Sequence, residues 1–156
     1  MAAMEPKKYF TIEEANSALP LVRAIVGDIV KKYAEVSDRK ARLDQIRKSR
    51  QSAARGPHDL YREEIVQVED ELDKEIIRLE EYIEELKALG VELKDINRGL
   101  IDFRSMMDGR EVYLCWLLGE EEVGHWHELD AGFAGRHSLL AGSSSDGKPD
   151  AGADES

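Results

Sequence analysis

The stretch that decides the fold runs from Val22 to Leu89 and consists of two helical patterns separated by a break. The first reads VRAIVGDIVKKYAEVSDRKARLDQI over residues 22–46, and the second reads IVQVEDELDKEIIRLEEYIEELKAL over residues 65–89. In both, apolar residues recur three and four positions apart, the spacing that places side chains on one side of a helix. Arg55-Gly56-Pro57 interrupts the pattern, because glycine and proline end helices.

The two patterns match each other if the chain folds back at this break. Facing residues of an antiparallel helix pair have position numbers with a nearly constant sum, and seven apolar pairs meet this condition. The pairs are Val22 with Leu89, Val26 with Leu86, Ile29 with Ile83, Tyr33 with Leu79, Val36 with Ile76, Leu43 with Val68 and Ile46 with Ile65. We therefore predict an antiparallel, coiled-coil-like helical hairpin over residues 9–90, which Gly90 ends as a C-terminal cap.

Near its start the hairpin segment contains Thr11-Ile12-Glu13-Glu14, which has the form of a capping box. In this motif the threonine hydroxyl and the glutamate carboxylate each accept a hydrogen bond from a backbone amide at the start of a helix. A short first helix is expected here, with Pro20 marking either a kink or the first turn of a second helix.

Residues 91–140 change character and predict strands. Turn signals at Asn97-Arg98-Gly99, Asp108-Gly109 and Gly119 separate stretches rich in β-branched and aromatic residues. We predict an antiparallel meander of three or four strands, with a C-terminal loop, packed against the base of the hairpin. The fold class is then α+β, residues 1–140 form a single domain, and residues 141–156, which lack large apolar side chains, form a disordered tail.

Composition narrows the location and the partners of the protein. The 156 residues carry a formal net charge of −11, which predicts repulsion from nucleic acid and from anionic membranes except at local basic patches. Cys115 is the only cysteine, which excludes an intramolecular disulfide and fits a reducing compartment. Neither a signal peptide nor a run of about 20 apolar residues is found. We expect a cytoplasmic protein that does not enter membranes.

The segment from Asp102 to Arg136 carries a family resemblance. Its motifs are residues 109–116 (GREVYLCW), Gly119-Glu120, Trp126-His127-Glu128 and residues 132–136 (GFAGR). Together with residues 10–16 (FTIEEAN), they resemble a bacterial family catalogued as domain of unknown function 2203, over roughly Tyr9 to Leu139. Arg104 and Ser105 stand where that family commonly has a proline after the Asp-Phe pair. The resemblance implies a shared fold and no activity, substrate or catalytic residue.

Two histidines alternate in the last predicted strand, so His125 and His127 should project from one face, which we expect to be the face of Val112, Leu114 and Trp116. Neutral imidazoles at this spacing can ligate a divalent transition metal, with Asp102 as the third ligand. Asp130 and His137 are alternative third ligands. In the competing interpretation, one histidine is a hydrogen-bonded core residue and the other is exposed.

A second hypothesis concerns the polar cluster that follows. A nearby carboxylate, Glu128, can orient His127 as a general base, and Arg136 can clamp a carboxylate or phosphate. Ligand-binding candidates are therefore Arg136, Gly132, Gly135 and Asp130, since glycines let the backbone approach a ligand. The structural alternative is a tight loop in which Phe133 fills the core and Arg136 pairs with Asp102 or Glu128. Cys115 is either a nucleophile or a small buried apolar residue.

The tip of the hairpin is basic on one arm and acidic on the other. The basic residues are Arg39, Lys40, Arg42, Arg47, Lys48, Arg50 and Arg55, and the acidic ones are Glu63, Glu64, Glu69, Asp70, Glu71 and Asp73. Such arms pair across their flanks, which favours ordinary coiled-coil packing. Phosphate backbones are the alternative partner of the basic arm.

Together these features favour a binding or interaction protein that uses the hairpin for a protein partner or for self-association and holds a small anion or metal ion near the two C-terminal motifs. The first alternative is a small enzyme with His127 as base and Arg136 as anion clamp. The second is an RNA- or ribosome-associated factor that acts through the basic tip.

Overall fold

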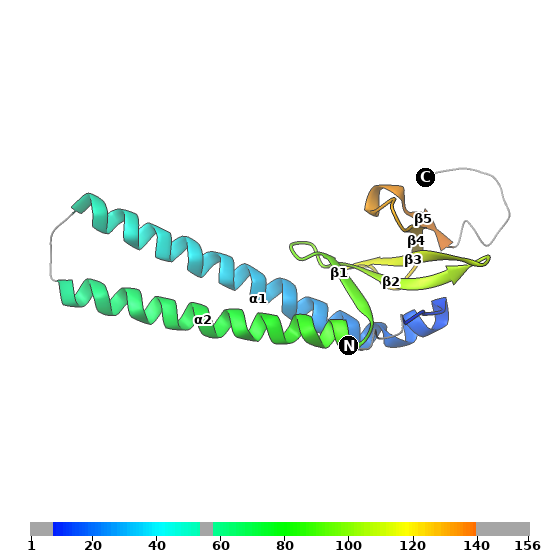
Figure 1. Cartoon of the computed structure of the whole chain (residues 1–156), viewed down its shortest axis with the longest axis horizontal. Coiled ribbons are helices and arrows are strands. Elements are labelled where there is room, and N and C mark those ends of the chain that lie inside the picture. Colours follow the sequence, from blue (N-terminus) through cyan, green and yellow to red (C-terminus); the bar gives the residue numbers. More distant parts are fainter. Residues whose placement is uncertain (1–7, 54–57, 140–156) are drawn as a thin grey trace, which may run out of the picture.

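The computed structural model describes residues 8–53 and 58–139, with the side chains of residues 50–61 excepted. Two long helices, α1 (Ile12–Ala53) and α2 (His58–Ala88), are followed by a sheet formed by strands between residues 91 and 138. Figure 1 shows α1 and α2 side by side as a long arm, with the sheet at the end away from the connection between the helices. The break at Gly56-Pro57 and the tail predicted for residues 141–156 lie outside the described residues.

The predicted capping box is present at the start of α1. The Thr11 hydroxyl accepts a hydrogen bond from the Glu14 amide at 3.0 Å, and the Glu14 carboxylate accepts one from the Thr11 amide at 2.9 Å. The short separate first helix was a wrong prediction, because α1 continues through Pro20 as one helix. Proline removes the hydrogen bond to the carbonyl four residues earlier and its ring crowds that carbonyl, so the helix continues only where packing offsets this cost. The buried face that runs through Leu19 and Val22 extends across that position.

The hairpin seam follows the predicted stripes. All members of the seven apolar pairs belong to the hydrophobic core or pack against it. Among the side chains that the structure describes, four ion pairs join the arms along the flanks of the seam: Lys32 with Glu75, Arg39 with Glu71, Arg42 with Glu64 and Arg47 with Glu69. The antiparallel hairpin is therefore confirmed, with opposite charges on its two arms.

The sheet contains five antiparallel strands in the order β1-β2-β3-β4-β5, a simple meander. The strands are β1 (Val91–Asp95), β2 (Leu100–Met107), β3 (Arg110–Leu117), β4 (His125–Glu128) and β5 (His137–Ser138). The α+β fold class is confirmed. Three or four strands were predicted, and the fifth strand is the two-residue β5. Asp108 and Gly109 both have positive φ, of 53° and 80°, which is the conformation of a tight hairpin turn between β2 and β3.

One face of the sheet packs on the base of the hairpin. It presents buried apolar side chains, including Val91, Ile101, Phe103, Leu114 and Trp116, that belong to the same core as the first half of α1. The rings of Phe10 and Phe103 meet edge to face with centroids 5.0 Å apart. Gly99 allows close contact, since a Cβ there would lie 3.0 Å from Val26 and 2.8 Å from Leu118.

The segment before α1 lies along β2 beyond the end of β1. The Phe10 amide donates to the Arg104 carbonyl at 2.8 Å, and the Ser105 hydroxyl donates to the Phe10 carbonyl at 2.6 Å. Arg104 and Ser105 continue β2 as a regular strand. The backbone at this position therefore takes part in fixing the N-terminal segment.

Candidate functional site

The second face of the sheet points away from the helices and is polar, yet its centre is buried. Residues directly opposite each other in neighbouring strands share a face. Asp102 of β2 lies opposite Cys115 of β3, and Tyr113 of β3 lies opposite His127 of β4. Asp102 and His127 are each 2% exposed, and Cys115 is fully buried.

The predicted face of the two histidines was therefore wrong. His125 lies opposite Cys115 and His127 opposite Tyr113, so both share the face of those residues, and it is Trp126 that shares the face of Leu114. The register between β3 and β4 depends on the length and path of the Leu118–Gly124 connection. A shift of one residue in register moves every side chain of a strand to the other face.

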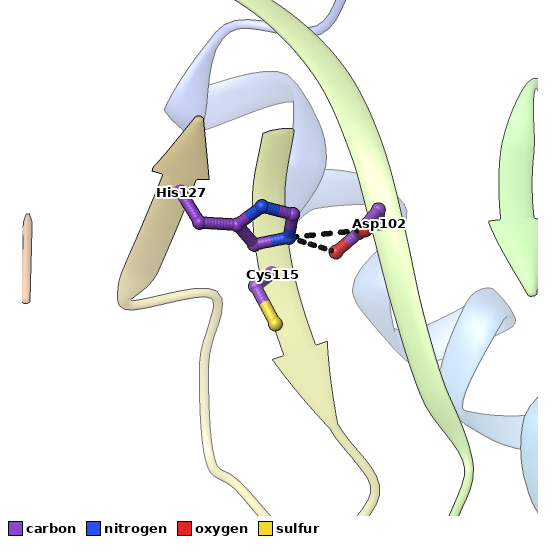
Figure 2. Close-up of side chains that lie close together, drawn as sticks. All are labelled: Asp102, Cys115 and His127. Atoms are coloured by element: carbon purple, nitrogen blue, oxygen red, sulfur yellow. Dashed lines mark hydrogen bonds and ion pairs between the residues drawn. The ribbon is translucent and has the colours of Figure 1, made fainter. Parts of the chain in front are cut away.

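Asp102, Cys115 and His127 form the centre of this face, and they come from three adjacent strands (Figure 2). The His127 Nε2 atom lies 3.1 Å from each oxygen of the Asp102 carboxyl group. One ligand-type atom from each of the three residues falls within 4.8 Å of the others. We call these three residues the Asp-Cys-His centre.

The hydrogen bonds of His127 determine where its protons lie. Nδ1 is 2.7 Å from the backbone carbonyl oxygen of Glu128, which can only accept, so Nδ1 carries a hydrogen and donates it. Nε2 is then directed at the two carboxyl oxygens of Asp102. The arrangement also leaves Nε2 as the atom available to a metal ion.

Burial controls the acidity of the other two members of the centre. It raises the pKa of Asp102, against the lowering effect of the charge and hydrogen bond of His127. It also raises the pKa of the Cys115 thiol to about 12, and the nearby Asp102 charge acts in the same direction. Cys115 is therefore protonated at neutral pH, which is unfavourable for a nucleophile.

An ionic network closes one side of the centre. Tyr113, whose ring centroid lies 5.4 Å from that of His127, donates its hydroxyl to Glu92 at 2.9 Å. Arg104 donates to Glu92 and to Glu111, in both cases at 2.9 Å. Burial alone would raise the pKa of Glu92, but hydrogen bonds from Tyr113 and Lys94 and the nearby positive charges leave it below the usual value. This side of the centre is therefore charge-compensated.

A smaller cluster lies on the other side, at His125. The Arg136 guanidinium donates through Nη2 to the Glu120 carboxylate and to the Nδ1 atom of His125. Burial lowers the pKa of His125, the charge of Arg136 lowers it further, and Glu120 opposes both effects. Arg136 thus pairs with Glu120, whereas the sequence had suggested Asp102 or Glu128 as its partner.

The other predicted site residues lie away from the centre. The Glu128 side chain projects from the face opposite to that of His127 and pairs with Arg110 at 2.7 Å, while Asp130 is exposed. The ring of His137 stacks against Trp126 with centroids 4.7 Å apart. Gly132 has a φ of 72°, and a Cβ on Gly135 would lie 2.8 Å from the Ala131 Cβ, so both glycines shape the loop before Arg136.

The three side chains of the centre are the donor types of a mixed-ligand metal site. Zinc accepts thiolate sulfur, imidazole nitrogen and carboxylate oxygen, and three protein ligands leave one coordination position open. His127 also has the outer hydrogen bond to a carbonyl that fixes the ring in known metal sites. The structure brings together His127 and Asp102 of the predicted ligand set and adds Cys115, while His125 contacts Arg136 instead.

Sequence reasoning treated Cys115 as an apolar residue or a nucleophile and missed it as a partner of Asp102. A usable signal was present, since Tyr113 and Cys115 alternate with Val112, Leu114 and Trp116. That alternation places the cysteine on the less apolar side of the strand. The register with β2 was needed to identify its neighbour.

A family model described as "Uncharacterized conserved protein (DUF2203)" matches residues 8–139. The chain belongs to this family, which confirms the resemblance found in the sequence. Searches of curated proteins and of solved structures give no match. Among the helices in the described part of the chain, none is both long and apolar enough to cross a membrane.

Proposed function

We propose that this protein is a metal-binding protein whose Asp-Cys-His centre holds one divalent transition metal ion, with Zn²⁺ the best fit. The supporting observation is the convergence of three different ligand-type side chains, from three strands, at a buried point of the sheet. Burying polar groups costs free energy unless they are paired, so packing alone does not account for three such side chains at one buried point.

The donor set favours zinc over the hard cations. Mg²⁺ and Ca²⁺ bind through oxygen ligands, whereas one thiolate, one imidazole and one carboxylate match zinc and its neighbours in the first transition row. Metal binding displaces the thiol proton of Cys115, because the thiolate is the ligand form. Asp102 and the Nε2 atom of His127 then bind the metal ion in place of their mutual hydrogen bond.

The same observations favour binding over the alternative of an enzyme with His127 as general base. A general base has to reach a proton of its substrate, and the His127 side chain is only 3% exposed. Glu128, its expected orienting partner, lies on the other face of the sheet. We therefore favour a binding protein over an enzyme. The free cysteine, Cys115, is consistent with a reducing compartment such as the cytoplasm.

The hairpin is proposed as the arm that contacts a protein partner or a second copy of the chain. Arg39, Arg42 and Arg47 each pair with a glutamate of α2, which leaves their charge less available to phosphates. This pairing supports a protein partner over RNA. The arm projects from the sheet, so a partner can reach it without disturbing the proposed metal site (Figure 1).

The decisive experiment is metal binding by tag-free protein. We expect elemental analysis of natively purified protein to give one zinc per chain, and zinc titration against a chromophoric chelator to give the same stoichiometry. Cobalt in place of zinc should produce a thiolate-to-metal charge-transfer absorption, which reports Cys115 directly. Cys115→Ser and Asp102→Asn should each weaken zinc binding by at least roughly tenfold to a hundredfold.

A matched control is His137→Gln, which removes a histidine from the neighbouring strand without touching the centre. It should bind zinc like the parent protein. Failure of the parent to bind zinc or cobalt, or equal affinity in Cys115→Ser, would overturn the proposal. Circular dichroism of each variant shows whether the fold is retained.

A further inference from the structure

Arg136 holds an unusual position, with a nearly buried guanidinium whose hydrogen-bonding capacity is only partly used. Its side chain is 11% exposed. Both of its hydrogen bonds within the described residues start from Nη2, one to Glu120 and one to His125. Nη1 and Nε donate none there, and neither belongs to the fully buried atoms that lack a partner. The three N–H groups on these two atoms therefore have no hydrogen-bond acceptor within the described residues.

His125 adds a further donor beside them. Arginine is always protonated, so Nη2 donates and the Nδ1 atom of His125 must accept. A neutral imidazole that accepts at Nδ1 carries its hydrogen on Nε2. The His125 side chain is 35% exposed, so this second donor belongs to a partly exposed ring.

The guanidinium of Arg136 packs against the Phe133 ring. Its central carbon lies 4.6 Å from the centroid of the Phe133 ring, and the guanidinium of Arg98 lies 4.9 Å from that centroid. Cation–π contact of this kind holds the guanidinium over a ring while its N–H edge remains available. Gly132 and Gly135 shape the loop that presents Phe133 and Arg136 to the sheet.

We propose that Arg136 and His125 form a binding subsite for a small oxyanion, such as phosphate or a carboxylate, beside the Asp-Cys-His centre. Arginine presents its N–H groups in a fork that matches two oxygens of a carboxylate or phosphate. The place of the subsite next to Cys115 follows from the strand register, in which His125 lies directly opposite Cys115. The anion subsite itself does not depend on metal binding. Only the statement that the anion would lie beside a bound metal ion rests on the proposed function.

Glu120 acts as an internal occupant of this subsite. Its carboxylate accepts from Arg136 through one oxygen and from the Leu117 amide, at 2.9 Å, through the other. A bound oxyanion competes with this carboxylate for the positive charge of Arg136. Removing the charge of Glu120 therefore strengthens anion binding, whereas removing Arg136 abolishes it. If Arg136 and Glu120 formed a purely structural ion pair, removing either residue would not change anion affinity in opposite directions.

The test is titration of metal-free, tag-free protein with inorganic phosphate at low ionic strength, followed by calorimetry and by the side-chain NMR signals of His125. We expect saturable binding at one site. Glu120→Gln should raise the phosphate affinity by on the order of tenfold, because the bond to Arg136 is charge-assisted. Arg136→Gln should remove the binding. Acetate as a second probe separates a carboxylate preference from a phosphate preference.

Glu128→Gln is the matched control, because Glu128 pairs with Arg110 on the other face of the sheet. It should leave phosphate affinity unchanged. Asp102→Asn disables the proposed metal centre and should still bind phosphate when metal-free, so loss of the metal site and loss of the anion subsite are distinguishable. No saturable binding by the parent, or weaker binding by folded Glu120→Gln, would overturn the inference.

Discussion

The centres of the two faces of the sheet are buried to a similar degree for different physical reasons. The face on the helices buries apolar side chains such as Trp116 and Phe103, neither of which is exposed at all. The outer face buries Asp102 and His127 at 2% exposure each. Burial of an apolar side chain is favourable against many different neighbours, because the hydrophobic effect is not directional. Burial of a polar group requires a partner at a defined distance and angle.

This difference teaches which face carries chemistry. An apolar core can be repacked with other side chains of similar volume, but a buried carboxyl group next to an imidazole and a thiol has few substitutes. The polar face thus holds ligand-type atoms at buried positions where few other side chains could be accommodated. We infer that the helix-facing side supplies most of the stability and that the outer side supplies the proposed binding sites.

The largest effect is expected on the helix-facing side. Trp116→Ala should lower the free energy of unfolding by about 3–5 kcal/mol, since it removes a fully buried ring and leaves a cavity. Urea unfolding of metal-free protein measures this change. Leu129→Ala, at a position that is 45% exposed, is the control and should stay within about 0.5 kcal/mol of the parent. Equal losses would contradict the location of the core.

The polar face should respond more moderately when one partner is changed. Asp102→Asn in metal-free protein should cost about 1–3 kcal/mol, because the new amide group places an N–H donor in a buried position that had only an acceptor. Urea unfolding in the presence of a chelator checks this value. The double variant with Asp102→Leu and His127→Leu should lose less than the sum of the two single changes, because it removes both buried polar groups.

A smaller, pH-dependent effect is expected at His125. Its pKa in the folded protein lies below the ordinary value of 6.5, so the unfolded chain takes up a proton first as pH falls. Stability should therefore decrease as pH drops through 6.5 towards the lower folded pKa. The loss should stay below about 1 kcal/mol, since the side chain is 35% exposed and solvent screens it.

The measurement is the difference in unfolding free energy between the parent and His125→Gln across this pH range. The difference isolates His125 from the other histidines, while Arg136 and Glu120 are unchanged in both proteins. A parent that becomes more stable relative to His125→Gln on acidification would show that the shift has the opposite sign.

The smallest effect is expected on the hairpin, in the exposed ion pair of Arg47 and Glu69. Their side chains are 47% and 42% exposed, so a double-mutant cycle should give a coupling of a few tenths of a kcal/mol. The coupling should fall further in high salt. A coupling as large as the effect of Asp102→Asn would contradict the view that exposed and buried polar pairs differ in kind.

Local signals made much of the fold predictable. The periodicity of residues 22–46 and 65–89 indicates two helices, and the constant sum of facing positions indicates how they pair. The turn at Asp108-Gly109 was predictable because few residues other than glycine, asparagine and aspartate adopt positive φ. The sequence left open whether Pro20 kinks one helix or begins a second, since the benefit of the buried face of α1 comes from contacts with the rest of the molecule.

The candidate site was predictable only in part. The sequence identifies His127, Asp102 and Arg136 as chemically capable residues, but their partners come from other strands. Cys115 was not paired with Asp102, and Glu120 was not paired with Arg136, because nothing local relates these positions. Distances along the chain do not give distances across a sheet until the register is known.

The sequence by itself determined the helices, the break between them, the strand-rich segment and the charges on each arm, because these depend on neighbouring residues. The tertiary structure alone decided which face holds His125 and His127 and which side chains surround them. The physical reason is that a strand has a side-chain period of two, so the register between strands selects one face or the other, and for β4 that register depends on the path of the Leu118–Gly124 connection.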